Sequence, residues 1–324
     1  MKRIEKPAGR YNIEVTTVDR PEPGSTEVIV AAEHSLISRG SELWRRYARE
    51  EPIDHAMMGY SLAGRIVSVG EHVTNYAIGD RVATNAPHAA FGTIEAEDPK
   101  GPDELIRIPD GLPSAHATFW PLATSAVLWI RECGLEPGID VVIQGQGLVG
   151  SGCLQVARAD AGARAIALDA LPLRCAVADR LGADAVINVE TTDPVAAVME
   201  LTDGGADVVI EAVGGPAGPG AFEDAQRMVD HGGLIQVLGL YEDEPLPLDS
   251  GTIQGRRLVG GYTNPEDRPE AGVHAMELLA DGAIQVGEML THRFPATDAP
   301  RVFALLHERP GEALGVVLEW NAGD

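Results

Sequence analysis

The chain contains very little lysine. Only Lys2, Lys6 and Lys100 carry an ammonium group, so arginine supplies nearly all of the 25 cationic side chains in 324 residues. Aspartate and glutamate number 49, which gives a formal net charge of −24 at pH 7. A surface this acidic repels phosphate backbones, so we expect no nucleic acid partner. The lysine shortage has two explanations, a GC-rich genome or adaptation to high salt, where an acidic surface keeps a protein soluble.

Cysteine and long apolar segments are scarce as well. Cys133, Cys153 and Cys175 form no metal-ligand spacing, and their odd number suits a reducing compartment. The longest apolar runs fall far short of the ~20 residues that span a bilayer. The first residues, MKRIE, lack the apolar segment of a secretory signal. We therefore expect a soluble cytoplasmic protein with no membrane partner.

What remains is the composition of an ordinary globular chain, with 44% apolar and 23% charged residues. At this length two domains are expected. Up to Pro113 the chain is rich in turns and short β-segments, with strands predicted at Glu27–Ala32, Leu62–Val69 and Phe91–Glu95. This part is predicted to form a β-rich domain.

Beyond Pro113, strands and helices alternate. The predicted strands are Asp140–Gln144, Ala165–Asp169, Ala185–Asn188, Asp207–Val213, Gly233–Leu238 and Arg257–Tyr262. Helices are predicted between most of them, and this alternation indicates βαβ units around a parallel sheet. A last strand, Gly315–Glu319, is expected to return to the first domain.

A glycine-rich turn follows the first of these strands. Residues 145–150 read GQGLVG, and they lie between the apolar strand Asp140–Gln144 and an apolar helix. This is the context in which G-x-G-x-x-G binds a dinucleotide. Gly145 makes the turn, Gly147 admits the pyrophosphate, and Gly150 lets the helix pack on the strand. The alternative is a glycine turn that serves packing alone.

The second strand of this region ends in an acid, Asp169, which lies 19 residues after Gly150. A carboxylate at this place binds the ribose hydroxyls of NAD and repels the 2′-phosphate of NADP. We therefore expect NAD(H) to be favoured over NADP(H). Alternatively, Asp169 is a loop acid or a helix cap. Arg174 has three possible roles: to cover the adenine, to pair with Asp169, or to accommodate a 2′-phosphate.

Further segments carry a family resemblance. They are residues 59–70 (GYSLAGRIVSVG), 79–82 (GDRV), 205–214 (GADVVIEAVG) and 291–295 (THRFP). With the dinucleotide motif, they resemble the medium-chain dehydrogenase/reductase superfamily over essentially the whole chain. Residues 37–42 (ISRGSE), 87–89 (PHA) and 122–126 (LATSA) are similar to its bacteriochlorophyllide dehydrogenase-like subgroup, which also contains alcohol dehydrogenases.

The resemblance implies an α/β fold with two domains. A GroES-like β-rich catalytic domain covers residues 1–118 and is completed by 295–324, and a doubly wound Rossmann domain covers 119–294. It also implies a homodimer, paired through an exposed sheet edge near Leu258–Tyr262. Ser125 is expected at the nicotinamide. The full set of expected cofactor-binding residues is Ser125, Gly145, Gly147, Leu148, Val149, Gly150, Asp169, Arg174, Val213 and Gly239.

The chain departs from the zinc-dependent members of the superfamily. Their metal ligands follow a Cys-Gly-(Thr/Ser)-Asp segment, a Gly-His-Glu segment and a third ligand before the nucleotide domain. Arg39, Tyr60 and roughly Pro121 stand at the ligand positions, and Ser61 replaces the glutamate. Arginine and proline do not bind zinc, which takes thiolate, imidazole or carboxylate ligands. We therefore expect neither a catalytic nor a structural zinc ion.

Without a metal, side chains must stabilise charge on the substrate oxygen and move a proton. The candidates are Tyr60 as acid, Ser41 as relay hydroxyl, Arg39 as oxyanion or substrate-anion partner, and His88 as acid or base. Each has a structural alternative. Tyr60 would be a packed aromatic, Ser41 a helix N-cap, Arg39 a surface partner of Glu42, and His88 part of a surface loop.

The resulting hypothesis is a zinc-independent, NAD(H)-dependent oxidoreductase that interconverts a secondary alcohol and a ketone. One alternative is an NADPH-dependent enoyl or quinone reductase acting on a conjugated C=C bond, where the developing enolate needs less stabilisation than an alkoxide. Asp169 argues against NADPH. The other alternative is a nucleotide-binding protein without catalytic activity. In each case the partner is a small molecule.

Overall fold

A computed structural model describes residues 1–97, 105–241, 245–261 and 264–321. Residues group into two compact units. One comprises Met1–Thr124, Pro269–Gly282 and Leu290–Asp324, and the other Ser125–Arg268 and Ala283–Met289. We call them the β unit and the nucleotide unit. Within the described residues, no helix is both long and apolar enough to cross a membrane.

The nucleotide unit is built on a six-stranded sheet in which neighbouring strands pair parallel, as predicted. The strand order is β10-β9-β8-β11-β12-β13. The strands are β8 (Asp140–Gln144), β9 (Arg164–Asp169), β10 (Ala185–Asn188), β11 (Ala206–Glu211), β12 (Val229–Val237) and β13 (Arg257–Gly260). Order and direction are those of a doubly wound sheet, which binds ligands beyond the carboxyl ends of its strands.

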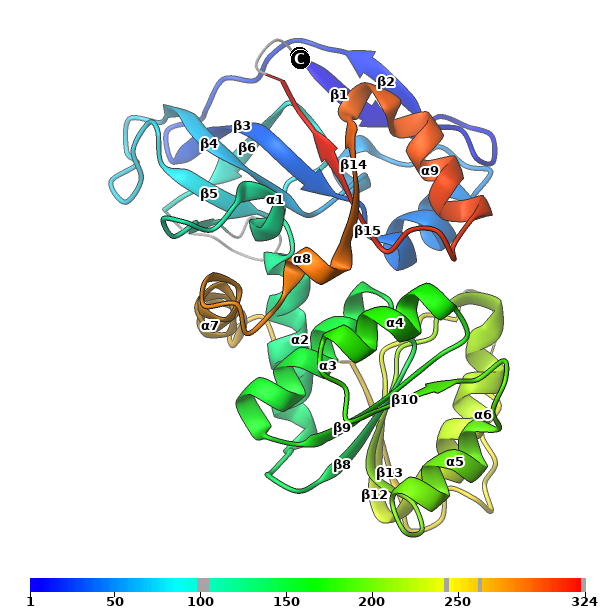
Figure 1. Ribbon diagram of the computed structural model, residues 1–324. Helices are drawn as coiled ribbons and strands as arrows, with labels where there is room; N and C mark the ends of the chain where they lie inside the picture. Colours follow the sequence, from blue (N-terminus) through cyan, green and yellow to red (C-terminus); the bar gives the residue numbers. More distant parts are fainter. Residues whose placement is uncertain (98–104, 242–244, 262–263, 322–324) are drawn as a thin grey trace. The chain divides into compact units, whose positions relative to one another are not determined.

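Helices cover both faces of this sheet (Figure 1). On one face lie α3 (Leu148–Ala161) and α4 (Pro172–Arg180), and on the other α5 (Pro194–Leu201) and α6 (Gly218–Met228). The central strands are therefore apolar throughout: Val141, Val142 and Ile143 of β8 are fully buried. The helices α2 (Trp120–Cys133) and α8 (Val286–Met289) complete the region.

The β unit contains a seven-stranded sheet in the order β14-β15-β3-β4-β5-β7, with β6 also paired to β3. Its strands are β3 (Glu27–Leu36), β4 (Leu62–Val69), β5 (Arg81–Thr84), β6 (Phe91–Glu95), β7 (Leu105–Arg107), β14 (Leu290–Pro295) and β15 (Gly315–Glu319). A second pair joins β1 (Lys2–Glu5) and β2 (Glu14–Thr17) antiparallel. Helix α9 (Ala299–Glu308) packs into the core through Phe303 and Leu306.

The remaining elements are short, apart from α7 (Arg268–Ala280) and the nine-residue π-helix η1 (Arg39–Tyr47). The short ones are α1 (Ser114–Ala117), η2 (His55–Met57), η3 (Gly215–Ala217) and η4 (Ala296–Asp298). A π-helix is uncommon and is found mostly at functional sites. Two of the predicted catalytic residues, Arg39 and Ser41, lie on η1. A third, Tyr60, forms a hydrogen bond with Ser38, the residue at which η1 begins.

The predicted strands Asp140–Gln144, Leu62–Val69, Phe91–Glu95 and Gly315–Glu319 have the predicted bounds. The last one pairs antiparallel with β3, so it lies in the sheet of the β unit. Other elements differ at their ends: β13 is described as Arg257–Gly260, and Tyr262 of the predicted strand lies outside the described residues.

Two differences from the sequence analysis concern the domain boundary and Ser41. Strand β14 was missed, and it pairs parallel with β15. This pairing attaches Leu290–Pro295 to the β unit, whereas the sequence analysis assigned residues up to 294 to the nucleotide domain. The helix around Trp44 begins after Ser38, so the alternative that Ser41 is its N-cap is wrong.

Candidate functional site

The glycine loop joins β8 to α3, and its three glycines have different surroundings. Gly145 has φ +84°, a backbone conformation that L-residues rarely adopt. A Cβ atom at Gly150 would lie 1.8 Å from the carbonyl oxygen of Gly145, so helix and turn meet too closely for a side chain. At Gly147, in contrast, a Cβ atom would have no atom within 4 Å. The protein itself requires the first and third glycines, whereas the second borders open space.

This space lies at the N-terminus of α3, a helix of 14 residues for which Gly147 is the N-cap. The first amides of a helix have no partners within it and carry the positive end of the helix dipole, so they bind anions. The loop therefore fits the pyrophosphate of a dinucleotide. Leu148 and Val149 stand in the first turn, where their backbone amides are available for this role.

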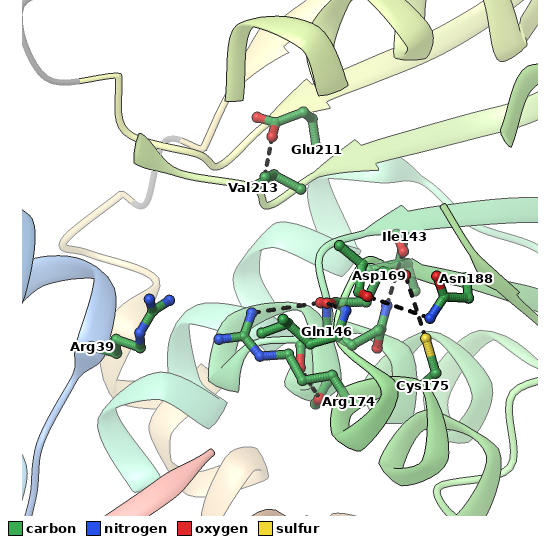
Figure 2. A network of polar contacts seen from close by, with 12 residues as sticks. Arg39, Ile143, Gln146, Asp169, Arg174, Cys175, Asn188, Glu211 and Val213 are labelled. Carbon is green, nitrogen blue, oxygen red and sulfur yellow. Dashed lines mark hydrogen bonds and ion pairs between the residues drawn. The ribbon is translucent and has the colours of Figure 1, made fainter. Parts of the chain in front are cut away.

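Asp169, at the carboxyl end of β9, lies beside this loop (Figure 2). Its Oδ2 accepts a hydrogen bond from the amide of Gln146 (2.7 Å), and Oδ1 accepts one from the amide of Leu171 (2.8 Å). Arg174 Nη1 lies 3.5 Å from Oδ2. Among the described residues, the buried Nε of Arg174 has no hydrogen-bond partner. Asp169 and Arg174 thus lie together next to the loop, which agrees with one predicted role of Arg174, pairing with Asp169.

Glu211, at the carboxyl end of β11, was missed as a site residue. It is fully buried, and its carboxyl group accepts hydrogen bonds from the amide of Val213 (2.7 Å) and the hydroxyl of Tyr241. Burial raises the pKa of this carboxyl group to about 7. The sequence does hold a signal, because Glu211 is the one acid at the end of the apolar run Val208–Ile210.

Tyr60 and Ser41 meet in the β unit. The Tyr60 hydroxyl donates a hydrogen bond to Ser38 Oγ (2.5 Å) and lies 3.5 Å from Ser41 Oγ. Ser38 is the N-cap of η1 and Ser41 lies in its first turn. Burial raises the pKa of Tyr60 above its ordinary value of 10.0, so the phenol stays protonated at neutral pH. We call Tyr60, Ser38 and Ser41 the hydroxyl cluster.

His88 lies in a separate, fully buried network. Its Nε2 is 2.9 Å from Glu42 Oε2, and its Nδ1 is 2.8 Å from Ser35 Oγ. The other Glu42 oxygen accepts a hydrogen bond from the amide of Ser38 (2.8 Å), so the network supports the start of η1. His88 and Glu42 are 0% exposed. The alternatives of a surface loop for His88 and of a surface pair between Arg39 and Glu42 are therefore wrong.

The donor set around the hydroxyl cluster does not fit zinc. Arg39 directs its Nε to the carbonyl oxygen of Leu306 (3.1 Å), and Tyr60 is bonded to serine. In the described ranges, no three His, Cys, Asp or Glu side chains gather closely enough to hold a metal ion. Zinc ligands in proteins are thiolates, imidazoles and carboxylates, none of which the cluster supplies.

The chain is similar in sequence and in fold to known dehydrogenases. A family model described as zinc-binding dehydrogenase matches residues 149–279. L-threonine 3-dehydrogenase of Bacillus licheniformis is 29% identical over 355 residues, with 98% of each chain covered. The structure of alcohol dehydrogenase TADH from Thermus sp. ATN1 matches with a TM-score of 0.83 at 24% identity, covering 99% of this chain and 100% of the other. The chain is a medium-chain dehydrogenase/reductase.

A second structure of the same fold is 2R,3R-butanediol dehydrogenase from Bacillus subtilis, with a TM-score of 0.83 and 19% identity over 99% of both chains. The predicted superfamily, its α/β fold with a parallel and an antiparallel sheet, and its character as an oxidoreductase are therefore confirmed. The individual site residues stay predictions.

In this medium-chain dehydrogenase/reductase, most of the predicted cofactor residues lie at the carboxyl ends of the parallel strands in the nucleotide unit. A Cβ atom at Gly145 would touch Val213 Cγ2 at 2.9 Å, and one at Gly239 would lie 2.6 Å from Glu211 Oε2. Ser125 lies half-buried on α2. In the β unit, Tyr60 and Ser41 are neighbours, whereas His88 belongs to the buried network behind Ser38.

Proposed function

We propose that the protein is an NAD(H)-dependent oxidoreductase that interconverts a secondary alcohol and a ketone without zinc. The observation that carries this proposal is the hydroxyl cluster, in which Tyr60, at the position of a metal ligand in the zinc-dependent members, lies against the hydroxyl groups of Ser38 and Ser41. The names of its relatives, a threonine dehydrogenase and a butanediol dehydrogenase, agree with a secondary alcohol as substrate.

The cofactor supplies the hydride chemistry when it is bound, and the chain supplies the proton. In ketone reduction, the Tyr60 hydroxyl turns its one hydrogen from Ser38 Oγ to the carbonyl oxygen of the substrate, and it then transfers this proton as that oxygen gains negative charge. In alcohol oxidation the same oxygen atom receives the proton back. Ser38 and Ser41 hold the hydroxyl in place and provide its next hydrogen-bonding partners. Arg39 is proposed to bind an anionic group of the substrate or the oxyanion itself.

The decisive experiment is turnover by protein treated with a chelator. We expect NAD-dependent oxidation of secondary alcohols, with L-threonine and butanediol in the panel, at the same rate before and after metal removal. Loss of activity that zinc restores would contradict the proposal. NADPH-dependent reduction of conjugated enones or quinones would favour the reductase instead, and binding of neither dinucleotide would favour a protein without catalytic activity.

Replacing Asp169 with asparagine is expected to weaken NADH binding about 10- to 100-fold and to leave NADPH binding unchanged or tighter. Asparagine keeps an oxygen for the Gln146 amide but loses the charge-assisted hydrogen bonds to the ribose, worth ~1.5–3 kcal/mol. Fluorescence titration with both dinucleotides measures the two effects separately.

A matched control is Asp184→Asn. Asp184 also accepts a backbone amide, that of Ala165 (2.9 Å), and also faces an arginine, Arg158 at 3.5 Å. It precedes β10, away from the carboxyl ends of the strands, so its replacement is expected to leave dinucleotide binding intact. Equal effects of the two replacements would contradict the role of Asp169.

We further propose a homodimer formed through the β13 edge of the parallel sheet. β13 is the last strand in the sheet order, and Leu258 on it is 42% exposed. Light scattering is expected to give twice the 34.2 kDa mass of one chain. Leu258→Asp is expected to yield monomers, whereas Leu248→Asp, which changes a leucine of similar exposure outside the strand, is expected to leave the dimer. A monomeric wild type would contradict the proposal.

A further inference from the structure

Glu211 and Asp169 lie on opposite sides of the phosphate-binding strand. In the sheet order, β9 with Asp169 is on one side of β8 and β11 with Glu211 is on the other, and both acids stand at carboxyl ends (Figure 2). The glycine loop that follows β8 fits the pyrophosphate, and Asp169 fits the adenosine ribose. The other half of the dinucleotide, with its nicotinamide, must then extend over the β11 side.

The carboxyl group of Glu211 holds two loops on this side. Its Oε1 accepts the amide of Val213, in the loop after β11, and its Oε2 accepts the hydroxyl of Tyr241, in the segment after β12. The backbone oxygen of Glu211 accepts the amides of Leu238 (2.7 Å) and Gly239 (3.0 Å).

These loops touch the phosphate loop directly. Val213 Cγ2 borders the position where Gly145 has no side chain, and the amide of Ala212 bonds to the carbonyl oxygen of Gln144 (2.9 Å). A shift of the loop after β11 would therefore change the shape of the turn that precedes the pyrophosphate site. Glu211 fixes this loop to the one after β12, together with the hydrogen bond from the amide of Gly215 to the carbonyl oxygen of Leu240 (3.2 Å).

Within the described residues, no cation is paired with the charge of Glu211. The two hydrogen bonds that its carboxyl group accepts within the described part of the chain come from neutral donors, an amide and a phenol. Asp169, in contrast, has Arg174 nearby. The nicotinamide ring carries a positive charge in NAD⁺ and none in NADH, so an unpaired carboxylate on this side attracts the oxidised form more strongly.

We infer that Glu211 is a positioning residue for the dinucleotide and that its charge favours NAD⁺ over NADH. It acts in two ways. It joins the loops that contain Val213, Gly239 and Tyr241, and its carboxylate exerts an electrostatic attraction on the nicotinamide ring. This inference rests on the proposed function, because it requires that the protein bind a nicotinamide dinucleotide.

The test compares the dissociation constants of NAD⁺ and NADH, measured by calorimetry at pH 8, for wild type, Glu211→Gln and Tyr241→Phe. At this pH most of the carboxyl group is ionised. Glu211→Gln removes the charge, and it is expected to raise the ratio of the NAD⁺ constant to the NADH constant about tenfold. Tyr241→Phe keeps the carboxyl group and removes one of its hydrogen bonds, which also raises its pKa. This variant is therefore compared with the wild type at pH 9, where the carboxyl group stays ionised, and both constants are expected to rise by a similar factor of about 3 to 10.

A control separates these effects from a general loss of packing. Gln236 is fully buried on β12, next to Ile210 in the sheet register, and bonds to the carbonyl oxygen of Trp129 (3.1 Å). Gln236→Leu is expected to change the melting temperature and leave the ratio of the two constants unchanged.

An unchanged ratio in Glu211→Gln would overturn the electrostatic part of the inference, and unchanged constants in Tyr241→Phe would overturn the positioning part. If Glu211→Gln does not fold, Glu211→Asp, which keeps the charge, must retain the preference for NAD⁺. A wild-type protein that binds neither dinucleotide would refute the proposed function itself, which is a different result.

Discussion

Replacing Gly147 with valine is expected to weaken NADH binding at least about 100-fold, or ~2.7 kcal/mol, while the protein stays folded. A side chain at this position meets no protein atom within 4 Å, and the backbone (φ −74°, ψ −171°) suits any residue. The valine side chain would instead occupy the space that the pyrophosphate needs. Fluorescence titration measures binding, and thermal unfolding measures the effect on stability.

The control for this experiment is Gly150→Ala, which is expected to give the opposite pattern. Its methyl group would lie 1.8 Å from the carbonyl oxygen of Gly145, so α3 must move away from the turn. Overpacking of this kind costs about 1–3 kcal/mol of stability or more, which appears as a lower melting temperature. If the Gly147→Val protein bound NADH like the wild type, the dinucleotide would not lie on the glycine loop.

Replacing Tyr60 with phenylalanine is expected to lower kcat about 10²- to 10⁴-fold and to leave the affinity for NADH and the melting temperature nearly unchanged. The phenol is the proposed proton donor, and the ring remains to fill its place. Because burial raises the pKa of Tyr60 above 10.0, we expect ketone reduction to persist at neutral pH and to decline only at higher pH, where the phenol loses its proton. Steady-state kinetics over a range of pH tests both statements.

Tyr76→Phe is the matched control, since Tyr76 is a partly buried tyrosine of the same unit whose hydroxyl donates to the carbonyl oxygen of Leu105 (2.9 Å). Its replacement is expected to leave kcat unchanged. Ser38→Ala should reduce kcat more than Ser41→Ala, because Ser38 Oγ lies 2.5 Å from the Tyr60 hydroxyl and Ser41 Oγ 3.5 Å. If the Tyr60→Phe variant had the kcat of the wild type, another group would have to donate the proton to the substrate oxygen.

Local patterns in the sequence were enough to predict the nucleotide unit. The strand before the glycine loop has the predicted bounds, a helix follows the loop as predicted, and Gly145 has the positive φ that favours glycine. Such features depend on neighbouring residues, namely hydrophobic periodicity and the conformational freedom of glycine. Strand β14 was not predicted from the sequence, because its stability comes from pairing with β15, more than twenty positions later in the chain.

Sequence alone thus determined the superfamily, the two-part architecture and the glycine loop between β8 and α3, because each of them depends on contiguous segments of the chain. Tertiary structure decided the partners of the polar side chains. Glu42 turns inward to His88, Tyr60 bonds to Ser38, and Glu211 to Tyr241. These pairs are separated by 46, 22 and 30 positions. A buried polar group must find a partner wherever packing places one, so its partner depends on how distant strands and helices meet and cannot be inferred from its neighbours in the chain.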